Sequence, residues 1–506
     1  MELGKVLELA AVAVPIYSWE QAGHDLYQIL PISILTLTIL VGIVVDLVTP
    51  RGYRSAAVAG VSLLGYLLAG IFAALHWWLG PSASAYHGFI SGDRFANFFE
   101  VFFSVLGILT VVISEPYLRR RRLLGPEFHI LIVAATVGMM ALAAATSLVT
   151  VFLSLETFSV ALYILCGWAR RDPRSQESSA KYLLVGSVGS AFLVYGMALT
   201  YGATGELQLV QIVHSVAAMH GPFSNPLLSI GIALMAIGFG YKISGAPFHQ
   251  WTPDVYQGAP LPVTTFMSVG TKAAAFAMIL TVFNDALGGA AEEWRAILAF
   301  VAVCSMVIGN VAALAQQSVK RLLAYSGVAQ AGYVLVGLVG TGPQQFSSVL
   351  FYLSAYLFMN FGAFAVLTML SGTEMDVDRF SDLDGLGRRH PLLGLMMTIF
   401  MLSLGGFPPF VGFFGKLFLF QAAIQGGFTW LVVIAVLASV VSVVYYLRVV
   451  LHVWSPAVGR RDMPAPRLAL GTVVVSGVLS VALGVYPSLL LAAAIYSAGA
   501  GLFAGR

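Results

Sequence analysis

Lysine and glutamate side chains occur within long apolar stretches of this chain, where ionisable residues are rare. Lys242, Lys272 and Lys416 each lie among aliphatic and aromatic residues, and so does Glu156. A charged side chain at the centre of a bilayer costs about 2.5–3.5 kcal/mol on insertion scales, so such residues usually face a wet cavity or a charged partner. Together these residues predict a connected polar path through an apolar protein.

Lysine is suited to proton transfer in such a setting, because burial disfavours its ammonium form and brings it closer to releasing a proton. Arginine stays protonated under the same conditions. A nearby carboxylate favours the ammonium, so a change at that carboxylate would switch the lysine between holding and releasing its proton. We therefore predict that Glu156 modulates Lys242, that Lys272 passes the proton onward, and that Lys416 exchanges it with the opposite side; the direction is assumed.

Each assignment has a competing interpretation. Glu156 and Lys242 could form a static ion pair that fixes helix packing. Lys181 could extend its ammonium to the cytoplasmic interface instead of joining the relay. His249 could shuttle protons near neutral pH or could be an ordinary hydrogen-bonded loop histidine. Asp254 is interpreted as a turn residue.

The composition places this chemistry in a membrane. Of 506 residues, 59% are hydrophobic and 10% are charged, against about 25% charged residues in soluble domains. The net charge of +3 is too small to indicate nucleic acid as a partner. Cys166 and Cys304 have no metal-ligand spacing, so we expect neither a disulfide nor an iron–sulfur cluster on this chain.

Apolar windows long enough to cross a hydrocarbon core of about 30 Å predict an all-α polytopic membrane protein with about fourteen transmembrane helices. The predicted spans are 26–48, 56–79, 96–114, 128–147, 149–168, 181–203, 227–246, 261–283, 295–315, 321–340, 347–371, 391–422, 428–452 and 467–490. Residues 1–20 are predicted to form an interfacial segment, because their apolar run is short and interrupted by Glu8.

Basic residues follow the first, third, fifth, ninth, eleventh and thirteenth spans, for example Arg119 to Arg122 after the third and Arg170, Arg171 and Arg174 after the fifth. Cytoplasmic loops of inner-membrane proteins are enriched in lysine and arginine. We therefore expect a multi-pass protein of a bacterial inner membrane, with both termini on the periplasmic side.

Glycine and proline interrupt the seventh span and the twelfth span close to Lys242 and Lys416. Paired discontinuous helices in corresponding positions are the signature of an inverted-repeat transporter. We expect four regions: the N-terminal segment with spans one to three (1–127), a first five-helix repeat of spans four to eight (128–283), an inverted second repeat of spans nine to thirteen (284–452), and a loop, span fourteen and tail (453–506).

Four strings resemble the antiporter-like subunits of respiratory complex I, and among these most closely the subunit N branch. They are LSLETFSVALYIL (153–165), SSAKYLLVGSVGSAFLVYGMALTYGATGEL (178–207), YKISGAPFHQWTPDVYQGAPLPVTTFMSVGTKAA (241–274) and KRLLAYSGVAQAGYVLVG (320–337). The resemblance covers roughly residues 95–450. It implies that the family's functional glutamate and lysines fall on Glu156, Lys181, Lys242, Lys272 and Lys416. Gln330 departs from the pattern, because many relatives have histidine there.

The family resemblance further implies a proton-pumping subunit driven by quinone reduction elsewhere in the complex. The implied partners are the other membrane-arm subunits (the M, K, J and A types) and the lipid bilayer. No cofactor is expected on this chain, and the quinone, FMN and iron–sulfur clusters are expected on partner subunits. Two alternatives are a secondary cation/proton antiporter of the related multisubunit Mrp type and a structural arm component whose lysines do not conduct.

Overall fold

The computed structural model describes residues 18–80, 84–219, 221, 223–340, 344–373, 375–456 and 466–498. Most of the predicted interfacial segment, residues 1–17, lies outside the described residues. The only strands in the described part are β1 (Ser84–Ala85) and β2 (Ile90–Ser91), which pair antiparallel in a short hairpin. All other regular elements are helices.

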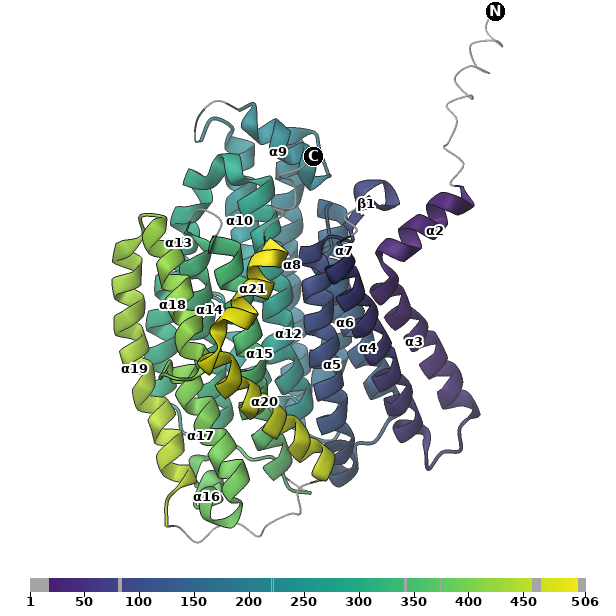
Figure 1. The fold of residues 1–506 in the computed structure, drawn as a ribbon, viewed down its shortest axis with the longest axis vertical. Helices are drawn as coiled ribbons and strands as arrows, with labels where there is room; N and C mark the ends of the chain where they lie inside the picture. The colour runs from purple at the N-terminus through teal and green to yellow at the C-terminus, as the bar shows by residue number, and fades with distance from the viewer. Residues whose placement is uncertain are drawn as a thin grey trace, which may run out of the picture.

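The helices form one bundle, with most axes running roughly parallel to the long axis of the molecule (Figure 1). In chain order they are α2 (Trp19–Gln28), α3 (Leu30–Val48), α4 (Arg54–Leu79), α5 (Arg94–Arg121), α6 (Pro126–Ala143), α7 (Leu148–Cys166), α8 (Pro173–Thr204), α9 (Leu209–Ala217), α10 (Pro226–Lys242), α11 (Trp251–Gly258), α12 (Leu261–Ile279), α13 (Ala291–Leu314), α14 (Val319–Leu338), α15 (Gln344–Leu370), α16 (Leu386–Arg389), α17 (Pro391–Gly405), α18 (Val411–Gln425), α19 (Thr429–Val453), α20 (Arg467–Val485) and α21 (Pro487–Ala498). A π-helical turn, Leu280–Ala286, extends α12.

Every predicted span corresponds to a helix or to a pair of helices separated by a break, so the all-α polytopic class is confirmed. Eleven helices in the described part are long and apolar enough to cross a membrane. The boundaries differ most at α5, which continues to Arg121, and at α8, which begins at Pro173. Both extensions are polar turns beyond the apolar window, where a hydropathy pattern no longer marks the helix.

Two helices form the centre of the bundle. All residues of α12 are buried, and nearly all of α15; Figure 1 shows both inside the bundle, with α3 and α19 at its outer edges. The outer helices expose large apolar side chains such as Leu47 and Leu437, as expected where lipid is the solvent. The central position of α12 explains how Lys272 is buried on every side.

The seventh and twelfth spans are discontinuous, as predicted. α10 ends at Lys242, and the chain continues without helical structure to α11. There the amide of Ala246 donates a 2.8 Å hydrogen bond to Ser305 Oγ. In the twelfth span α17 ends at Gly405, and the amide of Gly412 near the start of α18 donates to Ser403 Oγ at 3.2 Å. In both breaks a serine hydroxyl thus accepts a hydrogen bond from a backbone amide that has no helical partner inside the protein.

The two cysteines are free. Cys166 is buried and Cys304 is partly buried. The Cys166 thiol lies 3.9 Å from the Met267 sulfur. Cys166 thus packs as a small apolar residue in the core.

Candidate functional site

Lys242 lies at the C-terminal end of α10, where the seventh span breaks. Its side chain is buried, and Nζ donates a 2.9 Å hydrogen bond to Ser159 Oγ on α7. The ammonium also lies 5.7 Å from the centre of the Phe158 ring. A buried ammonium needs such partners, because an unpaired charge is very costly in a low-dielectric interior.

Glu156 lies on the same helix as Ser159, three residues earlier, and therefore on the same face one turn away. Its carboxylate accepts a short hydrogen bond from Ser190 on α8. Among the described residues Glu156 and Lys242 form no ion pair, although the carboxylate and the ammonium attract each other electrostatically. The structure thus brings the predicted pair into one region, with Ser159 rather than the carboxylate in contact with the lysine.

Lys272 lies at the middle of α12 and is only 2% exposed. Its Nζ donates a 3.3 Å hydrogen bond to the hydroxyl of Tyr256 on α11 and lies 5.4 Å from the centre of that ring. A side chain at Gly327 on α14 would come within 3.2 Å of the Lys272 ammonium. The glycine therefore leaves room for the lysine between α12 and α14.

A polar network lies next to Lys272 and is centred on Gln330 of α14. A small cavity of about 10 Å³ is lined by Lys272, Gln330 and Tyr352, among others, and this is close to the least space that a water molecule needs. The Gln330 amide donates to the Tyr446 hydroxyl at 2.9 Å and to the Leu404 carbonyl at 3.1 Å, and accepts a short hydrogen bond from Tyr352. At this position glutamine links the central lysine to the break of the twelfth span.

Lys416 lies on α18, just after that break, and is buried. Nζ donates hydrogen bonds to the Gly405 carbonyl at 3.2 Å and to Ser439 Oγ at 2.8 Å. The ammonium also lies 4.7 Å from the centre of the Tyr333 ring, a distance typical of a cation–π contact. No carboxylate contacts Lys416 among the described residues.

The Gln330 network and Lys416 therefore meet at adjacent backbone carbonyls of the twelfth-span break. Gln330 donates to Leu404 and Lys416 donates to Gly405, the next residue in the chain. The path runs from Lys272 across the small cavity to Gln330, then to the break and Lys416. Among the described hydrogen bonds none joins Lys242 directly to Lys272.

Lys181 lies on α8 in a partly exposed ionic cluster. Its Nζ is 2.6 Å from Glu177 Oε1 and 2.7 Å from Asp254 Oδ2, and its side chain is 40% exposed. Asp254 also pairs with Arg321 at 2.6 Å. The interpretation of Asp254 as a turn residue is wrong, because it lies in the first turn of α11 and joins basic residues from two other helices.

His249 lies in the non-helical segment between α10 and α11 and is partly buried. The centre of its ring lies 6.1 Å from that of Tyr325 on α14. Among the described hydrogen bonds none connects His249 to Lys242 or Lys272. The structure places it near the broken span without bringing it into contact with the relay lysines.

A buried ion pair near the start of α14 was missed by the sequence analysis. Lys320 is 3% exposed and pairs with Asp376 at 2.9 Å, and Tyr117 donates a 2.9 Å hydrogen bond to the same carboxyl group. Burial opposes ionisation of Asp376, but Lys320 and Arg121 hold its pKa below the ordinary value. The sequence offered no sign of this pair, because its members lie 56 positions apart in predicted loops.

Glu100 on α5 is a second missed residue. Its side chain is 2% exposed, and Oε2 has no hydrogen-bond partner among the described residues. The burial-cost argument that selected Glu156 applies equally to Glu100, because both lie inside predicted spans. The described residues contain no group of three histidine, cysteine or acidic side chains that could hold a metal ion.

Comparisons with known proteins agree with this architecture. The family model described as NADH:quinone oxidoreductase/Mrp antiporter, TM, matches residues 145–442. The NADH-quinone oxidoreductase subunit N of Trichlorobacter lovleyi is 43% identical over 92% of this chain and 96% of its own length.

Solved structures show the same fold. A chain of respiratory complex I from Thermus thermophilus superposes with a TM-score of 0.79 and 36% identity, over 91% of this chain and 98% of that one. A chain of the Mrp complex from Dietzia has a TM-score of 0.81 over 95% of this chain and 98% of its own, at 21% identity, and shares the fold alone. The chain therefore belongs to the NADH:quinone oxidoreductase/Mrp antiporter transmembrane family, on the branch of subunit N.

Proposed function

We propose that this chain is the proton-translocating, antiporter-like membrane-arm subunit of a NADH-quinone oxidoreductase, a non-redox part of a translocase. The observation that supports this function best is the row of buried lysines at the two breaks and at the centre of the bundle, each held by neutral polar groups. A lysine held in this way can lose and regain its proton without breaking a direct ion pair. Quinone reduction elsewhere in the complex would drive the transfer.

The roles of the residues follow from their contacts. Lys242 takes or releases a proton under the influence of Glu156, and Ser159 orients its ammonium. Lys272 passes the proton through the cavity and the Gln330 network, where one water molecule would bridge the gap. Lys416 exchanges the proton with the other side. Lys181 and His249 are assigned to the step in which a proton first enters the relay, because neither contacts a buried lysine.

The surroundings of the chain are part of the proposal. We expect it to reside in a bacterial inner membrane with both termini on the periplasmic side, next to subunits of the M, K, J and A types. Quinone, FMN and iron–sulfur clusters would be bound by partner subunits. The two inverted five-helix repeats, 128–283 and 284–452, give the lysines their related positions.

The test measures proton pumping in membrane vesicles that contain the assembled complex, with the pH gradient and quinone reduction followed together. Lys242→Ala and Lys416→Ala should each reduce redox-driven pumping by about 100-fold, within the range for loss of a proton-transferring group. The matched control is Arg388→Ala, which removes an exposed charge far from the relay. Pumping that survives in both lysine variants would make the chain a structural arm component.

A second measurement separates the proposal from an Mrp-type antiporter. The tagged wild-type chain is purified in mild detergent, and the copurifying proteins are identified by mass spectrometry. Recovery with quinone-site and iron–sulfur subunits supports the proposed function. Recovery with antiporter subunits alone, together with cation/proton exchange in the absence of an electron donor, would contradict it.

A further inference from the structure

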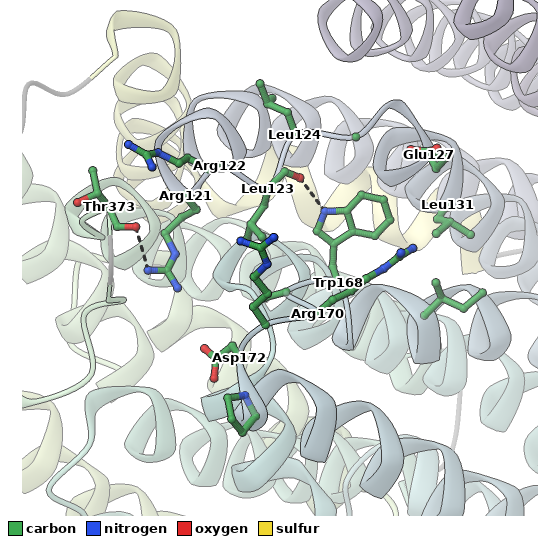
Figure 2. Close-up of a pocket in the computed structure, with 15 residues that line it drawn as sticks. Arg121, Arg122, Leu123, Leu124, Glu127, Leu131, Trp168, Arg170, Asp172 and Thr373 are labelled. Atoms are coloured by element: carbon green, nitrogen blue, oxygen red, sulfur yellow. Dashed lines mark hydrogen bonds between the residues drawn. The ribbon is translucent and has the colours of Figure 1, made fainter. Parts of the chain in front are cut away.

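A cavity of about 940 Å³ opens where the turn between α5 and α6 meets the turn between α7 and α8. Four arginines line it: Arg121, Arg122, Arg170 and Arg171. Figure 2 shows Arg121 and Arg122 from the first turn and Arg170 and Trp168 from the second around the same space. The relay described above uses none of these residues.

The cavity is electropositive. Its lining contains four arginines but only two acidic residues, Glu127 and Asp172. Asp172 Oδ1 is already engaged, because it accepts a 3.0 Å hydrogen bond from the Arg174 amide at the start of α8. Arg122, Arg170 and Arg171 are exposed, and none of them forms an ion pair with another described residue. Their guanidinium groups are available for an anion.

Arg121 is held differently. Its Nη1 donates to the Thr373 carbonyl at 3.3 Å, and its Nε lies 3.9 Å from Asp376. The floor of the cavity is also fixed, because Trp168 Nε1 donates a 2.9 Å hydrogen bond to the Leu123 carbonyl. The cavity is therefore formed by two turns that are tied to each other in this chain.

The cavity is continuous with an apolar face of the bundle. Leu131 in the second turn of α6 and Ile164 in the last turn of α7 line it. From Ile164 a stripe of apolar side chains runs down α7 at helical spacing, with Leu153, Val160 and Ile164 exposed by 58%, 52% and 51%. Positive charge thus lies directly at the end of a surface that faces the membrane interior.

We propose that this cavity binds an anionic glycerophospholipid, with its phosphate on Arg122, Arg170 and Arg171 and an acyl chain along the α7 stripe. Basic pockets between transmembrane helices on the cytoplasmic side are suited to anionic headgroups. Arginine is also the side chain that best matches a phosphate, because its planar fork donates two parallel hydrogen bonds. The apolar side chains of the stripe favour a lipid over a soluble phosphate, which would contact only the arginines.

The experiment uses the assembled, delipidated complex and native mass spectrometry to count bound dioleoyl phosphatidylglycerol during a titration. The test variant is the double substitution Arg170→Gln with Arg171→Gln. The matched control is Arg51→Gln with Arg388→Gln, which removes two exposed arginines outside the cavity. A single arginine near an anionic lipid contributes about fivefold in affinity, so the test variant should bind about 30-fold more weakly and the control should bind like the wild type.

Three further measurements identify the ligand. Dioleoyl phosphatidylcholine should bind the wild type no better than the test variant binds phosphatidylglycerol. Inorganic phosphate should compete poorly with phosphatidylglycerol for the wild-type complex. The Ile164→Asn variant should bind phosphatidylglycerol more weakly but bind phosphate as the wild type does. Independently of any variant, raising the salt concentration should weaken phosphatidylglycerol binding to the wild type, because partly exposed charges are screened.

Several results would overturn the proposal. Equal binding of phosphatidylglycerol by the test and control variants would show that the arginines do not hold the lipid. Phosphate binding as tight as that of the lipid would remove the role of the α7 stripe. Loss of a neighbouring subunit from the test variant, with lipid binding intact, would identify the surface as a protein contact.

Discussion

The two broken spans of this chain place their lysines in different electrostatic settings. Lys242 precedes the break of the seventh span and contacts Ser159, a residue of the helix that also contains Glu156. The carboxylate is close enough to attract the ammonium without touching it. The proposed function therefore has the charge on this lysine respond to a change at Glu156 or in the water around it.

Lys416 follows the break of the twelfth span and has neutral partners. Its ammonium contacts the Gly405 carbonyl, Ser439 and the face of Tyr333. In the described part of the chain no acidic side chain forms an ion pair with it. In the proposed relay, one lysine is controlled by a carboxylate and the other by fixed dipoles.

The largest effect should come from replacing either lysine by arginine. Lys242→Arg and Lys416→Arg keep the positive charge but remove the ability to release a proton, so each should lower pumping by about 100-fold. The measurement is redox-driven acidification of vesicles, with the amount of assembled complex determined in parallel. Normal pumping in the arginine variant at one site would show that this lysine does not release a proton. The comparison of the two lysines as proton carriers would then fail.

Lys320 provides a third setting, a buried lysine in direct contact with a carboxylate. Because an isolated buried charge is costly, Asp376→Asn should lower the free energy of unfolding by about 3–5 kcal/mol. Thermal denaturation of the purified complex measures this loss, and adding Lys320→Met should restore part of it. Stability that is unchanged in Asp376→Asn would contradict a structural role for the pair.

The same pair has a predicted pH dependence. Folding lowers the pKa of Asp376 through Lys320 and Arg121, against the effect of burial. A carboxyl group of this kind stabilises the protein above its unfolded pKa of about 3.9, and the stabilisation is lost as the pH falls through the lower folded pKa. Wild-type stability should therefore fall more steeply than that of the Asp376→Asn variant below about pH 4.

A smaller effect should distinguish the two breaks. Glu156→Gln removes the charge near Lys242 and should lower pumping by roughly tenfold, the effect of about 1.4 kcal/mol of electrostatic energy, while the complex still assembles. The matched control is Thr157→Val, an exposed neighbour on the same helix. Loss of assembled complex in Glu156→Gln would favour a packing role for the carboxylate.

The smallest effects should come from the serines that contact the lysines. Ser159→Ala and Ser439→Ala each remove one hydrogen bond, worth about 0.5–1.5 kcal/mol, so pumping should fall by a few-fold in each. In the double variant with Glu156→Gln, Ser159→Ala should act non-additively and Ser439→Ala additively, because only Ser159 both contacts Lys242 and lies on the helix of Glu156. Equal non-additivity at both serines would show that the two breaks are coupled.

The spans, the two breaks and the buried lysines could be predicted from the amino-acid sequence alone. Apolar length and the cost of burying a charge are local properties, so Lys242, Lys272 and Lys416 could be recognised without any contact information. The same argument should also have selected Glu100. The interpretation of Asp254 failed for a related reason, because a neighbouring proline says nothing about the distant basic residues that the carboxylate meets.

The groups that surround each lysine could be identified only from the folded structure. Ser159, Tyr256 and Ser439 are neutral polar residues of a kind common in membrane helices, and nothing in their spacing marks them as partners of lysine. The arginines of two separate turns likewise appear in the sequence only as a sign of cytoplasmic loops. Their convergence around one cavity follows from the packing of α5, α6, α7 and α8, which depends on contacts between residues far apart in the chain.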